Sequence, residues 1–158
     1  MINIRNRPII GWREMVLLPK LSDLRFPCKV DTGAASSSLD AIVLGTEQRE
    51  NKKGEKHTWV RFSIPSIDGT STATIHSARL LEIRPIRSSN GETSDRCVIV
   101  TAAELMGHRW PIEITLNDRK NMGFPMLLGR KALRRMFLVN VGRSWLGGRP
   151  EDFLDGDD

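Results

Sequence analysis

One aspartate with small neighbours is the residue of this chain best placed to do chemistry. Asp31 closes the stretch 26–30, whose apolar residues alternate with others as they do in a β-strand. It is followed at once by Thr32, Gly33 and Ala34. The glycine allows a sharp turn or a close approach of another segment, and the alanine keeps the surroundings narrow. On these residues alone, Asp31 is either a helix cap and turn former or a general acid or base.

Two further stretches carry glycine where the backbone must change direction. Asn90 and Gly91 lie between two β-rich runs, and both residue types tolerate a positive φ, which is typical of a hairpin turn. Because residues 87–92 are all polar, we expect this hairpin to project from the protein. Residues 125–129 form a short apolar run that ends in glycine, directly before a helix expected over residues 130–136.

The rest of the pattern predicts the elements that must hold these residues in place. Strands are expected over residues 9–18, 26–30, 38–43, 57–64, 70–86, 96–101, 112–117, 125–129 and 137–141. In residues 57–64 the alternation is strict, with Val60, Phe62 and Ile64 on one face. Many short strands with one short helix predict an all-β fold, closed into a barrel. We place a single domain at residues 1–150 and an acidic tail at residues 151–158.

The composition is that of a soluble globular protein, with 39% hydrophobic and 27% charged residues. No apolar run approaches the roughly 20 residues of a membrane helix, and residues 1–7 lack the apolar core of a secretory signal. We therefore expect a cytoplasmic protein without a membrane partner. The two cysteines, Cys28 and Cys97, are interpreted as buried thiols, with one disulfide as the alternative.

The charge is unevenly distributed along the chain. The net charge is +5, but residues 151–158 hold five acids and no bases, so the remaining 24 basic and 14 acidic residues give the rest of the chain +10. A body this basic attracts nucleic acid, ribosomes or acidic peptides in a salt-dependent way. The alternative is that the charge only keeps the protein soluble.

The order of these features resembles the retropepsin-like aspartic proteases. In that fold a second glycine segment, here Leu127-Leu128-Gly129, packs beneath an Asp-Thr-Gly loop. The resemblance is closer to one bacterial and archaeal family of the fold, the RimK-associated proteins, which are often labelled ATP-dependent zinc proteases. Its pattern runs through residues 11–14, 28–34 with Ser37 and Leu39, 59–62, 87–91, 117–119 and 126–130, and it covers roughly residues 9–142.

The resemblance implies an aspartic endopeptidase that works as a homodimer. Hydrolysis of this type needs two carboxylates, one taking a proton from water while the other donates to the carbonyl oxygen. This chain has one Asp-Thr-Gly, so a twofold axis would place a second Asp31 about 3 Å from the first, where the pair shares a proton. The implied catalytic residues are Asp31, Thr32 and Gly33, with the Thr32 hydroxyl tying the two loops together.

The resemblance also implies a set of residues that bind the peptide substrate. They are Ala34, Ser88, Ser89, Asn90, Gly91, Arg119 and Arg130. Residues 88–92 would then be a flap that closes over the peptide, although an ordinary surface hairpin is the alternative. Arg119 and Arg130 have a second reading as structural partners of acids. Retroviral members usually carry an aspartate where this chain has Ala35, so Arg130 lacks that partner, and Glu14 is a candidate replacement.

Neither half of the family label finds support in the residues. The chain has no His-Glu-x-x-His, its cysteines stand 69 positions apart, and it has no phosphate-binding Gly-x-x-x-x-Gly-Lys loop. We therefore expect no metal and no cofactor.

Three functions remain to be compared. RimK-type ligases add glutamates to a ribosomal protein, so the association implies an acidic peptide or protein substrate and a ribosomal-protein link. The alternative is a peptide- or ribosome-binding module of the same fold with weak or no catalysis, given Ala35. An RNA-binding barrel is the weakest hypothesis, because few aromatic residues such as Trp59, Phe62 and Trp110 could stack bases, and a nucleic-acid partner is not expected.

Overall fold

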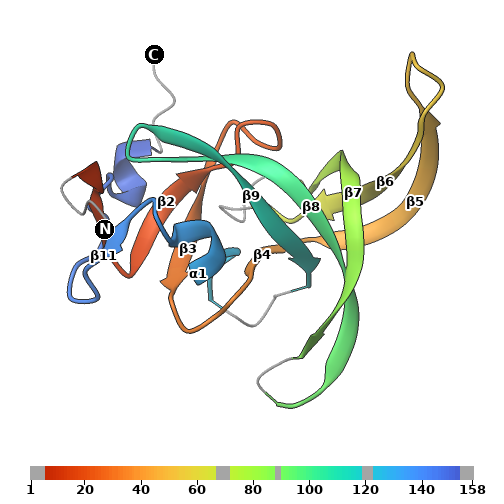
Figure 1. Cartoon of the computed structure of the whole chain (residues 1–158). Coiled ribbons are helices and arrows are strands. Elements are labelled where there is room, and N and C mark those ends of the chain that lie inside the picture. Colours follow the sequence, from red (N-terminus) through yellow and green to blue (C-terminus); the bar gives the residue numbers. More distant parts are fainter. Residues whose placement is uncertain (1–5, 67–71, 88–89, 119–122, 154–158) are drawn as a thin grey trace.

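The protein is mostly β-structure (Figure 1), in a computed structural model that describes residues 6–66, 72–87, 90–118 and 123–153. The strands are β1 (Ile9–Ile10), β2 (Arg13–Leu17), β3 (Arg25–Asp31), β4 (Ser37–Asp40), β5 (Ile42–Glu50), β6 (Lys56–Ile64), β7 (Thr74–Arg87), β8 (Thr93–Leu105), β9 (His108–Asn117), β10 (Met126–Gly129) and β11 (Leu138–Val139). The helices are α1 (Arg130–Leu133) and the 3-10 turn η2 (Pro150–Phe153). The predicted all-β class is confirmed.

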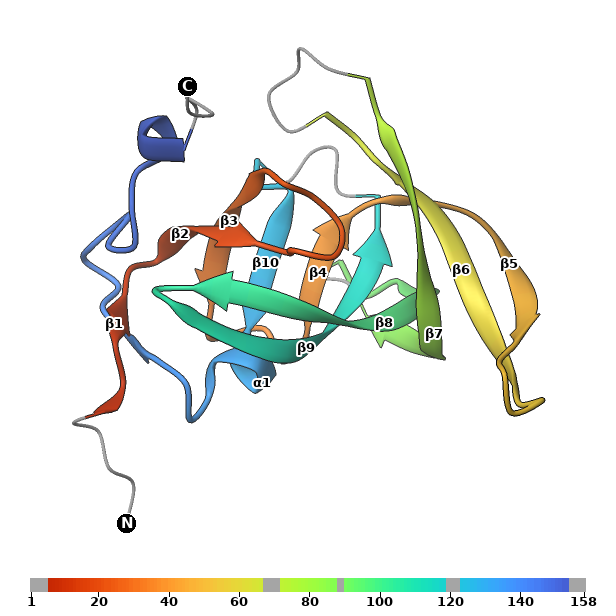
Figure 2. The ribbon, with the colours of Figure 1, turned by 90° about the horizontal axis from the view of Figure 1, so that it is seen from above.

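Six of the strands form a ring around the core. Their order is β2-β3-β10-β4-β9-β8, and β8 returns to β2 through the single residue pair Leu17 and Glu104. Phe26, Ile114 and Met126 are among the fully buried side chains inside it. Strands β7, β6 and β5 continue from β8 as an arm that extends away from the ring (Figure 2). The expected closed barrel is therefore a ring closed at one residue pair, with three further strands outside it.

Several expected elements divide where another segment crosses them. The strand predicted over residues 9–18 breaks at Gly11, where the backbone of Arg143 crosses it. The approach is so close that a Cβ on Gly11 would lie 2.3 Å from the Arg143 carbonyl oxygen. The strand predicted over residues 38–43 divides at Ala41, whose N–H donates to the Asn117 carbonyl while β5 leaves the ring. The helix expected over residues 130–136 ends at Leu133, because Arg135 has a φ of 69°.

The most consequential feature of the sheet is the position of β10. It pairs in parallel with β3, with Gly129 opposite Asp31, and antiparallel with β4, with Met126 opposite Leu39. Strands β3 and β4 follow each other in the chain, yet a strand from much later in the sequence lies between them. The loop that joins β3 to β4 must therefore pass over the end of β10.

The β7–β8 hairpin and the C-terminal segment complete the molecule. The hairpin turn contains Gly91 with a φ of 88°, and residues 90–92 are exposed at the tip of the projecting ribbon (Figure 1), as the sequence predicts. β11 pairs in parallel with β1 of the same chain. In the part of residues 151–158 that is described, the Phe153 ring lies 4.6 Å from the guanidinium of Arg25.

Candidate active site

Asp31 is the last residue of β3 and begins a tight turn. Its Oδ1 accepts the N–H of Gly33 at 3.0 Å, and its carbonyl oxygen accepts the N–H of Ala34 at 3.2 Å. The side chain is half-buried, while Val30 before it is buried. Among the described residues, none hydrogen-bonds to Oδ2. The carboxylate is thus a turn former through one oxygen and keeps the other oxygen for further chemistry.

The distal glycine packs directly against the loop that follows Asp31. A Cβ on Gly129 would lie 2.5 Å from the Ser36 carbonyl oxygen and 2.9 Å from that of Ala34. The N–H of Arg130 donates to the Ala34 carbonyl at 2.8 Å, and the N–H of Lys131 donates to that of Ala35 at 3.2 Å. Two consecutive carbonyls of the loop are therefore fixed by the first turn of α1, which confirms that this segment packs beneath the Asp loop.

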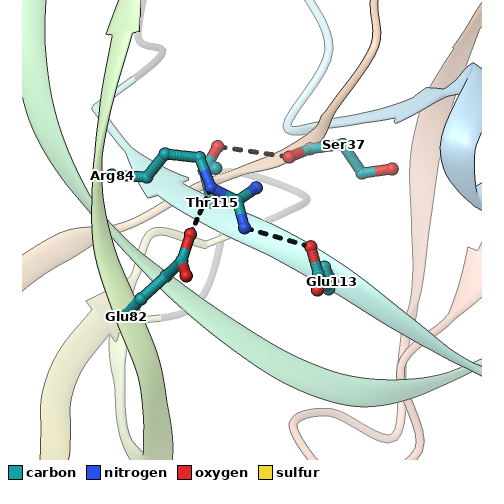
Figure 3. A network of polar contacts seen from close by, with 5 residues as sticks. All are labelled: Ser37, Glu82, Arg84, Glu113 and Thr115. Carbon is teal, nitrogen blue, oxygen red and sulfur yellow. Dashed lines mark hydrogen bonds and ion pairs between the residues drawn. The ribbon is translucent and has the colours of Figure 1, made fainter.

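A buried pair of hydroxyl residues forms the next layer of support. Ser37 and Thr115 are 3% and 2% exposed. The Ser37 hydroxyl accepts the N–H of Gly129 at 3.0 Å, and the Thr115 hydroxyl donates to the Ser37 carbonyl at 3.1 Å (Figure 3). Ser37 thereby joins β4, β9 and β10 just behind the loop. Ser37 belongs to the family pattern, but the sequence predicts no role for either residue, since a serine in a strand carries no signal of its partner.

Arg130 uses its side chain on the same loop. Its Nη1 donates to the Gly33 carbonyl at 3.2 Å, so the guanidinium braces the turn from the helix side. The predicted partnership between Arg130 and Glu14 is wrong. Glu14 is fully buried, and its carboxylate accepts the N–H groups of Gly11 at 2.7 Å, Leu146 at 3.0 Å and Gly147 at 2.9 Å.

Glu14 is therefore a structural residue, and the sequence predicted the wrong partner for it. Three backbone donors occupy its two oxygens, so it anchors the C-terminal segment on β2. Beside it, the Arg13 guanidinium lies 4.8 Å from each of the Trp12 and Trp145 rings, which adds a cation–π contact to the same junction. The signal that could have found this role is an acid in the middle of an apolar strand, which must have donors when it is buried.

The β7–β8 turn lies at the same end of the molecule as the C-terminal end of β3 (Figure 1). At its tip, the N–H of Glu92 donates to the Asn90 side chain at 3.0 Å, and the Arg87 side chain donates to the Gly91 carbonyl at 3.5 Å. These contacts define the turn, and closure over a peptide stays a prediction. Ser88, Ser89 and Arg119 lie outside the described residues.

A cleft of about 510 Å³ opens beside the Asp31 loop, between α1 and β9, and reaches Ser36 and Ser37. Arg84 of β7 lies on its wall, where its Nε donates to Glu82 at 2.5 Å and its Nη2 donates to Glu113 at 3.3 Å (Figure 3). The hydrogen bond with Glu82 is the main cause that raises the pKa of the Arg84 guanidinium. This arginine is therefore a permanent cation already balanced by two acids.

We next considered whether side chains in the described part of the chain gather as metal ligands. No group of three or more His, Cys, Asp or Glu side chains gathers there as a ligand set. Cys28, which is buried, and Cys97, which is half-buried, form no disulfide, and burial raises the pKa of the Cys97 thiol. Across the same residues, no helix has the length and apolarity to cross a membrane.

The chain matches the model of a known protein family, and its fold matches that of a solved structure. The model of the family described as "RimB-like: Retropepsin-like aspartic endopeptidase RimB" matches residues 9–150. A crystal structure of a protein of unknown function from Legionella pneumophila matches with a TM-score of 0.71 and 24% identity, covering 89% of this chain and 98% of that one. That likeness shows the fold.

Two curated relatives carry the same name, "Probable alpha-L-glutamate ligase". The protein of Shewanella halifaxensis is 34% identical over 148 residues, which are 93% of this chain and 31% of that protein. The protein of Parasynechococcus marenigrum is 35% identical over 149 residues, again 93% of this chain and 31% of the relative. The chain thus spans less than a third of the length of these relatives.

Proposed function

The chain belongs to the RimB-like family of retropepsin-like aspartic endopeptidases, and on that basis we propose that it hydrolyses peptide bonds as a homodimer with one Asp31 from each subunit. The observation that carries the proposal is the position of Asp31. It lies half-buried at the end of β3, opposite Gly129, with one carboxylate oxygen held by the Gly33 N–H.

The proposed mechanism follows from bringing two such carboxylates together. Two aspartates about 3 Å apart cannot both ionise, so the pair holds one proton between them. The ionised member takes a proton from water as the water oxygen attacks the peptide carbonyl carbon, and the protonated member donates to the carbonyl oxygen. When the tetrahedral intermediate collapses, a proton passes to the leaving nitrogen and the C–N bond breaks.

The rest of the site supports this mechanism by holding the carboxylate still. The hydrogen bond from Gly33 orients the Asp31 side chain, and the bonds from Arg130 and Lys131 to the loop carbonyls fix the backbone beneath it. Such preorganisation matters because a misplacement of about 1 Å can lower a rate by about 10²-fold. Thr32 is proposed to join the two loops across the dimer axis, and the β7–β8 hairpin to exclude water as a flap.

We propose a glutamate-rich substrate. Two observations support it: the relatives named as glutamate ligases contain a region similar to nearly all of this chain, and the chain without its last eight residues carries +10. Hydrolysis breaks the amide bond that a glutamate ligase forms, so the glutamate polymer would be the product of one activity and the substrate of the other. A glutamate tail on a ribosomal protein in the cytoplasm fits this chemistry.

A binding module of the same fold is the second candidate function. It is favoured by Ala35, which provides no acid at the position where retroviral members hold the substrate backbone. Here the Ala35 carbonyl accepts the Lys131 N–H, and the Arg130 side chain turns to the Gly33 carbonyl. In this case the protein would bind glutamate-rich chains without cutting them.

The test compares Asp31→Asn with the wild type on a peptide that ends in several glutamates, with product masses as the readout. Asp23→Asn is the matched control, because it removes one exposed carboxylate from a surface turn. We expect Asp31→Asn to abolish cleavage and Asp23→Asn to leave it unchanged. Equal cleavage by the wild type and Asp31→Asn would refute the mechanism, and EDTA should have no effect on an aspartic enzyme.

Dimerisation can be tested in the same assay by mixing subunits. Excess Asp31→Asn protein should suppress wild-type activity, because each mixed dimer holds one carboxylate instead of two. The suppression should follow the calculated fraction of mixed dimers. A strictly monomeric mass in solution, with full activity and no suppression, would remove the proposed pair.

A further inference from the structure

The cleft adjoins the end of the loop that carries Asp31. One end is formed by Ser36 and Ser37, which come directly after the loop. Its side is formed by α1, where the N–H of Lys131 donates to the Ala35 carbonyl at 3.2 Å. A peptide that leaves the site past Ser36 would therefore meet Lys131 first and then the residues at the end of the helix.

The charges on the α1 side of the cleft are unbalanced. Lys131 and Arg134 both line it and are exposed, and neither forms an ion pair with any acid of the described residues. On the opposite wall, Arg84 is paired with both Glu82 and Glu113, so this cluster of one base and two acids adds no net positive charge (Figure 3). The net positive charge that a ligand would meet thus comes from the helix side.

The spacing of the two free cations suits an extended acidic chain. Residues three apart on a helix have Cβ atoms about 5–6 Å apart. Arg134 still belongs to this geometry, because its N–H donates to the Arg130 carbonyl at 2.9 Å. In an extended peptide, side chains on one face recur every second residue, about 6.6 Å apart. Two alternate acidic side chains can therefore reach the two cations together.

The other walls of the cleft are suited to the methylene groups of such side chains. Trp110, Ile112 and Met136 contribute apolar surface, and the Trp110 indole is fixed by its hydrogen bond to the Ala132 carbonyl at 3.0 Å. A glutamate side chain could lay its two methylenes on this surface while its carboxylate meets a cation. An uncharged glutamine would keep the first contact and lose the second.

We propose that this cleft is a distal subsite of the peptidase, in which Lys131 and Arg134 bind two acidic side chains of the substrate beyond the bond that is cut. The proposal rests on the proposed function, and it assigns the preference for acidic peptides to two residues outside the Asp31 loop. They act on substrate affinity, so their loss affects KM and leaves the chemical step unchanged.

The test uses the double variant Lys131→Gln/Arg134→Gln. Its matched control is Lys52→Gln/Lys53→Gln, which removes the same charge from the exposed β5–β6 turn on the arm. On a glutamate-rich peptide, we expect KM to rise at least tenfold in the cleft variant, with kcat within twofold of wild type and no change in the control. On the same peptide with glutamines in place of the distal glutamates, wild type and cleft variant should have equal KM.

A binding measurement separates this proposal from the peptidase activity. The labelled glutamate-rich peptide is titrated, by fluorescence anisotropy, into Asp31→Asn protein with and without the two cleft substitutions. A tenfold or larger weakening by the cleft substitutions supports the subsite, whether or not the wild type proves to be a peptidase. Equal affinity, or an equal loss in the Lys52/Lys53 control, would overturn it. If wild type does not cleave while this difference persists, only the proposed function has failed.

Discussion

Replacement of Gly129 by alanine should lower the cleavage rate more than it lowers the stability of the protein. The backbone of Gly129 has φ −90° and ψ 172°, which alanine adopts freely, so the substitution acts through space alone. Its Cβ would lie 2.5 Å from the Ser36 carbonyl oxygen, about 0.8 Å closer than an ordinary carbon–oxygen contact of about 3.3 Å. The atoms it meets are backbone, which cannot rotate away.

The size of the effect follows from that overlap. Overpacking of a buried site costs about 1–3 kcal/mol, which corresponds to a fall in Tm of roughly 2–12 °C for a domain of this size. If β10 and the loop move apart by most of the overlap, Asp31 moves with the loop. A displacement near 1 Å lowers a rate by about 10²-fold, so cleavage should fall much further than stability.

The assay pairs thermal unfolding with cleavage of the glutamate-rich peptide at a temperature where all variants are folded. Gly142→Ala is the matched control, because its Cβ would lie 3.4 Å from the Asn140 side chain, an ordinary contact. We expect it to be neutral or stabilising by up to about 1 kcal/mol. A Gly129→Ala protein with wild-type Tm and a cleavage rate within twofold of wild type would refute the argument.

Three further predictions follow from polar groups that are buried or half-buried. Ser37→Ala should cost about 1–3 kcal/mol, measured by urea unfolding, because the N–H of Gly129 loses its acceptor; an unchanged midpoint would contradict this. Glu14→Gln should lower the free energy of unfolding by about 2–4 kcal/mol, since an amide N–H₂ would face a backbone donor. The control Glu151→Gln, at an exposed position, should change it little. Equal urea midpoints for the two variants would show that Glu14 does not anchor the C-terminal segment. Burial lowers the pKa of His76, so the unfolded chain takes up its proton first and stability falls as the pH drops below the ordinary histidine value of about 6.5. His76→Phe should reduce the fall in Tm between pH 7.5 and pH 5, and identical slopes would exclude this origin.

Local patterns were enough to predict the parts of the site that a few consecutive residues determine. The alternation in residues 26–30 placed Asp31 at a strand end, and the apolar run before Gly129 gave a strand followed by a helix. Val60, Phe62 and Ile64 are buried as their spacing predicts. Each of these depends on side-chain periodicity over one element, which the sequence states directly.

The contacts that complete the site depend on residues far apart in the chain, and these were not predictable. Glu14 serves backbone N–H groups of Leu146 and Gly147, and Arg130 serves the Gly33 carbonyl. Backbone donors and acceptors are present at nearly every position, so no residue type marks the one that will be used. The same holds for the cleft, whose unpaired cations come from α1 and the residue after it, while the acids paired with Arg84 come from β7 and β9.

The insertion of β10 between β3 and β4 also fixes when the proposed site can form during synthesis. Until residues 126–129 have been made, β3 and β4 each lack a neighbour on one side, and such open edges invite pairing with other chains. The segment that fills the gap also carries Gly129 and the first turn of α1, which hold the Asp31 loop. A nascent chain therefore contains the aspartate well before it contains the segment that holds the aspartate loop, and the proposed site can form only after residues 126–130 have been made.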